Sequence, residues 1–287
     1  MLSLEDAKKY VGINFEPGDP DYRWSLKDHQ KQPTKLSEWT ESAIQNIRRS
    51  KYLRTFGPES LVRTLFDILV CDRLELLDDT AAAKQLKVVA EVQMDVLAEY
   101  RSIHTRISGR ADWTLGYMDE KDNLQEMLVV IEAKARGNIV AALPQLLIYL
   151  AGIQDARSMA KKTNKTVFGV ATDSDQFIFA ILKENRNAFV SKALDWLEEK
   201  ELIVSFLDNI LQDAIESSPH TTRVRIGNKK IKQFEQALGK TYMFGDQGCS
   251  SSSISDDDSN NLGTWNVVEV NGVSLLQLCE EDEDNAR

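Results

Sequence analysis

Hydrophobic and polar positions alternate along residues 88–97 (VVAEVQMDVL), which predicts a β-strand with one buried face. Residues 107–117 (ISGRADWTLGY) predict a second strand, with Asp112 on one face and Trp113 on the other. The run 126–135 is apolar on both faces at first, as in a central strand that is covered on both sides. The short turn before it predicts that the second and third strands form a hairpin.

Helical spacing of apolar residues flanks these strands. The segment after Pro58 predicts a helix with Glu59 in its first turn, at the edge of the buried stripe. A second helix is expected at about residues 140–160, where Gln145 and Tyr149 are four residues apart and share one face. Residues 166–183 then predict two strands of a further hairpin.

Further helices are predicted before and after this central region. A helix over residues 3–10 is expected, with Ser3 and Asp6 as a capping box, and Ser37 is expected to cap a helix that runs to about Lys51. Residues 187–217 predict helical structure that is broken near Lys200.

This order of elements predicts an α/β protein with a mixed central sheet flanked by helices, extra helices and a disordered acidic tail. We expect an N-terminal arm with helices at 1–54, an α/β domain with a C-terminal helical segment at 55–245, and a low-complexity tail at 246–287.

Acidic charge is concentrated in that tail. The chain carries a net charge of −10, and the tail holds ten acidic residues and one basic residue, so the other 245 residues carry only −1. The body of the protein is therefore close to neutral, which is compatible with binding nucleic acid. The apolar piece 262–279 predicts either a hairpin around Asn271-Gly272 or a peptide that docks on a partner or on the chain itself.

Several classes of protein are disfavoured. The three cysteines and three histidines are scattered, which argues against a disulfide framework and a cysteine or histidine metal site. The N-terminus lacks the apolar stretch of a signal peptide, and no apolar run reaches the length that we expect of a membrane span. We therefore expect an intracellular protein, in the cytoplasm or the nucleus, with no membrane partner.

The stretch VVIEAKA, residues 129–135, places charges in an otherwise buried strand. Glu132 and Lys134 share a face of the strand because side chains alternate. An isolated charge buried there costs several kcal/mol, so these two must pair, emerge at the strand end or meet an external charge. A solvated ion pair at a strand end is the plain alternative to a functional site. Glu59 could likewise serve only the helix dipole, and Asp112 could be a solvated strand residue.

Taken together, Asp112 in GRADWTLGY, Glu132-Ala133-Lys134 in VVIEAKA, and Gln145 to Tyr149 in PQLLIY resemble the PD-(D/E)XK nuclease superfamily. The Gln-x-x-x-Tyr pattern is similar to its lambda-exonuclease and RecB-type branches. The resemblance covers about residues 55–183 and implies an αβββαβ core of the restriction-endonuclease type. The chain has Ala111 where the family commonly has proline before the aspartate.

The resemblance implies a metal-dependent phosphodiesterase that acts on nucleic acid, with DNA favoured over RNA. Asp112, Glu132 and the backbone carbonyl of Ala133 would bind Mg²⁺ or Mn²⁺, because hard cations take oxygen ligands. Lys134 would orient the attacking water and stabilise developing charge.

Three further residues have implied roles in that site. Glu59 would bind a second metal ion or its water, Gln145 would hold a ligand or the attacking water, and Tyr149 would contact a phosphate. Ordinary helix packing is the alternative for Gln145 and Tyr149.

A nuclease must also bind phosphates along its substrate, with an affinity that depends on salt. The candidate basic residues form three groups. They are Lys161, Lys162 and Lys165; Arg223, Arg225, Lys229, Lys230 and Lys232; and Arg48, Arg49, Lys51 and Arg54. A solvated surface is the alternative role for each group. The alternative function is a catalytically inactive nuclease fold that acts as a nucleic-acid- or protein-interaction module.

Overall fold

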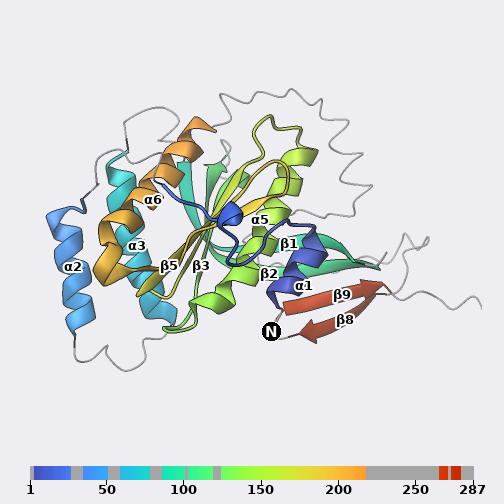
Figure 1. Ribbon diagram of the computed structural model, residues 1–287, viewed down its shortest axis with the longest axis horizontal. Helices are drawn as coiled ribbons and strands as arrows, with labels where there is room; N and C mark the ends of the chain where they lie inside the picture. The colour runs from blue at the N-terminus through green and yellow to red at the C-terminus, as the bar shows by residue number, and fades with distance from the viewer. Residues whose placement is uncertain are drawn as a thin grey trace, which may run out of the picture.

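A computed structural model describes most of the chain (Figure 1). The described residues are 3–26, 35–50, 59–77, 86–100, 103–118, 124–217, 265–270 and 273–278. The helices are α1 (Leu4–Val11), α2 (Glu38–Arg49), α3 (Glu59–Glu75), α5 (Ala142–Met159) and α6 (Trp196–Glu216). The strands are β1 (Leu86–Tyr100), β2 (Ile103–Met118), β3 (Leu124–Ala133), β4 (Val167–Thr172), β5 (Gln176–Leu182), β6 (Ala188–Val190), β7 (Leu194–Asp195), β8 (Trp265–Val270) and β9 (Val273–Leu278).

The strands form one mixed sheet, as the sequence predicts. Its order is β6-β5-β4-β3-β2-β9-β8, with β1 paired to β2 and β7 paired to β5. The β3–β4 pair is parallel, and α5 makes the crossover between these two strands. The predicted hairpins β2–β3 and β4–β5 are both present and antiparallel. The predicted fold class and the two predicted hairpins are therefore confirmed, and the structure adds the parallel pairing of β3 with β4.

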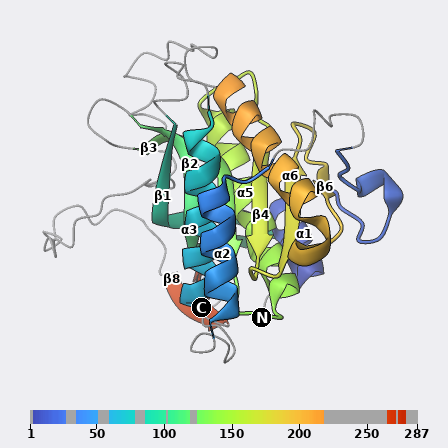
Figure 2. The ribbon, with the colours of Figure 1, turned by 90° about the vertical axis from the view of Figure 1, so that its left-hand side faces the viewer.

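Helices cover both faces of this sheet (Figures 1 and 2). On one face, α5 and α1 pack on apolar residues that include Val96, Val130 and Leu146. On the other face, α3 and α6 pack on a second cluster that includes Trp113 and Ile131, and α2 packs on α3. Burial of apolar side chains on both faces explains the near-continuous apolar run of β3.

The long β1–β2 hairpin passes from one of these clusters to the other. Ile107 and Ala111 on β2 pack in the cluster under α5, whereas Trp113 and Leu115 pack in the cluster under α3 and α6. These four residues are separated by even numbers of positions, so they would share one face of a flat sheet. Their division between two clusters shows that the hairpin twists between Ala111 and Trp113. The change of cluster falls at Asp112, between the β1–β2 pairs Ala90–Trp113 and Val92–Ala111.

The N-terminal helices begin at the predicted caps. The Ser3 hydroxyl accepts a hydrogen bond from the Asp6 backbone N–H over 3.1 Å, and the Ser37 hydroxyl accepts one from the Thr40 backbone N–H over 3.2 Å. Each bond satisfies a backbone donor that a helix start leaves free. The segment after α1 is irregular, as expected, but Phe15 is buried against the core.

The helical prediction for residues 187–195 is wrong. These residues include β6 and β7, which pair with β5, and the helix begins only at Trp196. Backbone pairing with β5 satisfies hydrogen bonds that a helix would make locally, so sheet contacts decided the outcome. The Asp195 side chain then caps the helix. The expected break near Lys200 is confirmed, since Glu199 has non-helical backbone angles.

The C-terminal apolar piece forms the hairpin that the sequence offered as one alternative. The strands β8 and β9 are antiparallel, and β9 pairs with residues 105–108 of β2. The rest of the expected acidic tail, Pro58, and the basic residues Arg223, Arg225, Lys229, Lys230 and Lys232 lie outside the described residues.

The stretch Ile139–Met159, which contains α5, bears on the expectation that no apolar run reaches the length of a membrane span. Among the described helices it is long and apolar enough to cross a membrane. However, 72% of its apolar window is buried inside the protein. Such burial is what a central crossover helix shows when protein covers it on most sides.

Candidate functional site

Asp112 and Glu132 lie side by side where β2 and β3 separate. Trp113 and Ile131 form the final residue pair at this end of the ladder, and the next position on each strand carries one of the two acids. The Asp112 carboxylate also accepts a hydrogen bond from the Ala133 backbone N–H over 2.6 Å. The structure thus brings together the two carboxylates that the sequence placed at this strand end.

The sheet is irregular at the level of Asp112. Residues 105–108 of β2 pair with β9, but residues 109–112 pair with neither β3 nor β9 in the described backbone. On the neighbouring strand β1, Glu91 has a φ of 55°, which is uncommon for a residue other than glycine. The ladder is therefore interrupted beside Asp112, whose side chain is nevertheless buried.

Glu132 is the most deeply buried acid of the site. It is 2% exposed, and its Oε1 atom lies 2.5 Å from the Lys134 Nζ atom. Its Oε2 atom is buried and has no hydrogen-bond partner among the described residues. Burial raises the pKa of Glu132 to about 8; Lys134 opposes this rise, and the nearby charge of Asp112 adds to it. One carboxylate oxygen is therefore poised for a further cationic or proton-donating group.

Arg63 connects the acids of three elements. From the second turn of α3, its guanidinium donates to Glu59 over 2.9 Å, to Glu91 of β1 over 3.1 Å, and to the Asp112 carboxylate. Arg110 also donates to Glu91, over 3.2 Å. The sequence analysis gave no site role to Arg63 or Glu91, so it missed both. Only the spacing of Glu59 and Arg63 at i, i+4 could have indicated this contact.

Asp112 is nearly as buried as Glu132, at 5% exposed. Burial raises its pKa above the ordinary value, although the Ala133 N–H and the Arg63 guanidinium oppose the rise. The negative charge of Glu59 acts in the same direction as burial. Burial is therefore the main cause of the raised pKa of Asp112, and its cationic neighbours only partly oppose it.

Tyr149 and Gln145 reach the same region from α5. The Gln145 amide donates to the Tyr149 hydroxyl oxygen over 2.9 Å, and Tyr149 is buried. Burial raises the pKa of Tyr149, and the charges of Glu132 and Asp112 raise it further, so the hydroxyl stays protonated. A side chain at Gly109 would meet this hydroxyl at 2.1 Å, which shows how closely Tyr149 lies against β2.

The predicted basic group of Lys161, Lys162 and Lys165 lies away from these acids, whereas Lys51 and Arg54 of another group lie outside the described residues. Lys161, Lys162 and Lys165 follow the far end of α5, and at 1.5 Å per helical residue they are roughly 20 Å or more from Gln145. Among the described residues, the basic side chains that contact the acids of this region are Lys134, Arg63 and Arg110, and the sequence analysis gave a role only to Lys134.

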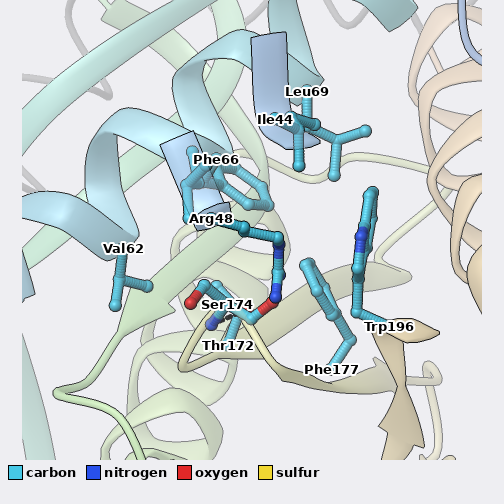
Figure 3. Close-up of a pocket in the computed structure, with 10 residues that line it drawn as sticks. Ile44, Arg48, Val62, Phe66, Leu69, Thr172, Ser174, Phe177 and Trp196 are labelled. Carbon is cyan, nitrogen blue, oxygen red and sulfur yellow. Dashed lines mark hydrogen bonds between the residues drawn. The ribbon is translucent and has the colours of Figure 1, made fainter. Parts of the chain in front are cut away.

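Arg48, another predicted phosphate ligand, lies in a separate pocket that contains none of the site acids (Figure 3). Its guanidinium donates to Asp175 over 2.8 Å and lies over the Trp196 ring at 5.4 Å. The other residues around it are mostly apolar and come from α2, α3 and the β4–β5 turn. They are Ile44, Val62, Leu65, Phe66, Leu69, Thr172, Ser174 and Phe177. Arg48 thus joins α2 to the sheet, which accounts for it without a substrate.

The donor atoms beside Asp112 fit a hard cation. In the part of the chain that the structure describes, no three acidic, histidine or cysteine side chains converge as a metal cluster. A set of Asp112, Glu132 and the Ala133 carbonyl needs only two such side chains, and all three donors are oxygen. The buried Glu132 Oε2 atom without a partner is the observation that favours a cation in this position.

Comparisons with known proteins add no relative. No model of a protein family matches the chain. A search of curated protein sequences also finds no match. The chemistry of the site therefore carries the functional argument alone.

Proposed function

We propose that this protein is a metal-dependent nuclease that hydrolyses phosphodiester bonds, with DNA favoured over RNA as the substrate. The carrying observation is Glu132, a buried carboxylate beside Asp112 with one oxygen on Lys134 and the other without a partner. A buried acceptor without a hydrogen bond costs about 1–3 kcal/mol. The Oε2 atom of Glu132 would therefore destabilise a purely structural ion pair, whereas a bound cation would satisfy it.

Asp112, Glu132 and the Ala133 carbonyl would hold Mg²⁺ or Mn²⁺. A bound ion of this kind supplies positive charge for the phosphate oxygens and lowers the pKa of a water molecule. Glu59 is half-exposed at the rim, tied to Arg63, and can hold a second ion or a water only after that contact opens.

The other residues have roles that follow from their own contacts. Lys134 keeps an ammonium beside Glu132 at the strand end, where it can donate to the attacking water or to the developing charge. Gln145 donates to the oxygen of Tyr149, which leaves the phenolic proton for another acceptor such as a phosphate oxygen. Gln145 therefore orients Tyr149 in this proposal.

The experiment compares cleavage by the full-length protein and three variants. Single- and double-stranded DNA and RNA are incubated with Mg²⁺, Mn²⁺ or EDTA. We expect cleavage only with metal, and Asp112→Asn and Lys134→Met should each lower its rate by at least about a hundredfold. Arg106→Gln is the matched control, because Arg106 pairs with Asp95 on the same hairpin outside the site. Cleavage that persists in EDTA, or in both site variants, would rule out this function.

A second candidate is an interaction module with the same fold and no catalysis. It is favoured by the ion pairs that the site already makes, Lys134 with Glu132 and Arg63 with Asp112. For this function we expect nucleic-acid or protein binding that is unchanged by EDTA and by both site substitutions, with no cleavage under any condition.

A further inference from the structure

The Arg63 guanidinium lies between three acidic side chains at the site. Its Nη2 atom contacts both Glu59 and Asp112, and its Nη1 atom contacts Glu91. Its side chain is 33% exposed, so solvent reaches the guanidinium while Asp112 remains buried. A single guanidinium thus contacts carboxylates from α3, β1 and β2.

Each oxygen of the Asp112 carboxylate already accepts one hydrogen bond. Its Oδ2 atom accepts from the Ala133 N–H, and its Oδ1 atom accepts from Arg63. A divalent ion bound to Oδ1 would lie in contact distance of the guanidinium, and like charges at that separation repel strongly outside bulk water. An ion at Asp112 and Arg63 in its present position therefore exclude each other.

We propose that Arg63 is a built-in competitor of the divalent ion, which holds Asp112 in the ion-free protein and sets the metal affinity of the site. This inference rests on the proposed metal site and adds a residue that the proposed function does not require. When the ion binds, Arg63 gives up Asp112 and keeps Glu59 and Glu91, which lie on the more exposed side of the cluster.

The two states place different demands on stability. Without the ion, Arg63 screens the repulsion between Glu59, Glu91 and Asp112, so its removal leaves these acids uncompensated. With the ion, Asp112 has another partner and the loss of Arg63 matters less. A variant without the guanidinium should therefore bind metal more tightly and depend on metal more strongly for stability.

Calorimetric titration of Mn²⁺ into the full-length protein tests this directly. Arg63→Gln should bind Mn²⁺ about tenfold more tightly than the wild type, since the ion no longer displaces a charged hydrogen-bond donor from Asp112. Arg63→Lys should fall between the two because it keeps the charge and loses the forked geometry. Arg106→Gln should bind as the wild type does.

Thermal denaturation gives a readout that does not depend on catalysis. In EDTA, Arg63→Gln should unfold at a lower temperature than the wild type, and saturating Mn²⁺ should raise its midpoint by more than it raises that of the wild type. Arg106→Gln should show the wild-type increment.

The outcomes separate this inference from the proposed function. Equal or weaker Mn²⁺ binding by Arg63→Gln, alongside clear binding by the wild type, overturns the competition and leaves the metal site standing. Absence of Mn²⁺ binding in the wild type and all variants overturns both. Tighter binding by Arg63→Gln with an unchanged Arg106→Gln supports the competition.

Discussion

The helix α3 carries two arginines, and their surroundings differ in kind. Arg73 has a side chain that is 0% exposed, and it contacts Asp72, Asp208 and the Lys35 carbonyl. Arg63, near the start of the same helix, is partly exposed and is shared by acids of three elements. The first arginine joins α3 to α6 and to the segment before α2, whereas the second faces an excess of carboxylates.

The pKa shifts of their partners have opposite signs. Burial raises the pKa of Asp72, but hydrogen bonds from Ser37 and Arg73 outweigh it and leave the pKa below its ordinary value. At the other end, burial leaves the pKa of Asp112 and of Glu132 above their ordinary values despite their cations. An acid whose hydrogen bonds lower its pKa despite burial is typical of a structural contact. An acid whose pKa stays raised is typical of a binding or catalytic site.

Loss of the buried arginine should have the largest effect on stability. Arg73→Met leaves Asp72 buried without its main cation, which should lower the free energy of unfolding by about 3–5 kcal/mol. Urea denaturation followed by circular dichroism measures this change, and Arg106→Gln should cost less in the same assay, because the less buried Asp95 keeps its hydrogen bond from Ser108. A cost for Arg73→Met no larger than that of the control would contradict the scaffold role.

Glu132 should give a pH-dependent effect of intermediate size. Its folded pKa of about 8 lies above the ordinary value of 4.5, so between these pH values the folded protein holds a proton that the unfolded chain releases. The wild type should therefore lose stability as pH rises from about 4.5 to 8, and Glu132→Gln should not.

Unfolding in EDTA across this range measures the difference between the two proteins. We expect Glu132→Gln to be more stable than the wild type at pH 8, with the difference shrinking as the pH falls and vanishing near pH 4. A constant difference across the range would show that Glu132 does not titrate differently on folding.

The outer contact of the buried arginine should have the smallest effect. Asp208 lies 3.4 Å from Arg73 and is 29% exposed, so its ion pair is long and partly solvated. Asp208→Asn should lower the free energy of unfolding by less than about 1 kcal/mol in urea. A loss as large as that of Arg73→Met would show that Asp208, and not Asp72, is the partner that balances the arginine.

Alternation and helical spacing located the strands and helices that frame the site. Alternation placed Asp112 and Glu132 on neighbouring strands of a predicted hairpin and Lys134 on the face of Glu132, whereas the register that brings the two acids together includes two irregularities between β2 and β3. Gln145 and Tyr149 could be paired from their spacing alone. Residues 188–195 were mispredicted because their strand structure depends on pairing with β5.

The sequence by itself determined which residues share a face of each strand or helix, because that follows from the period of the backbone. Only the tertiary structure decided that Arg63 reaches Asp112, 49 residues away, and that Glu91 joins them. Those contacts depend on the twist of the β1–β2 hairpin and on where α3 lies on the sheet. Neither is encoded in the alternation of a single segment, since twist and packing are set by the sum of many distant contacts.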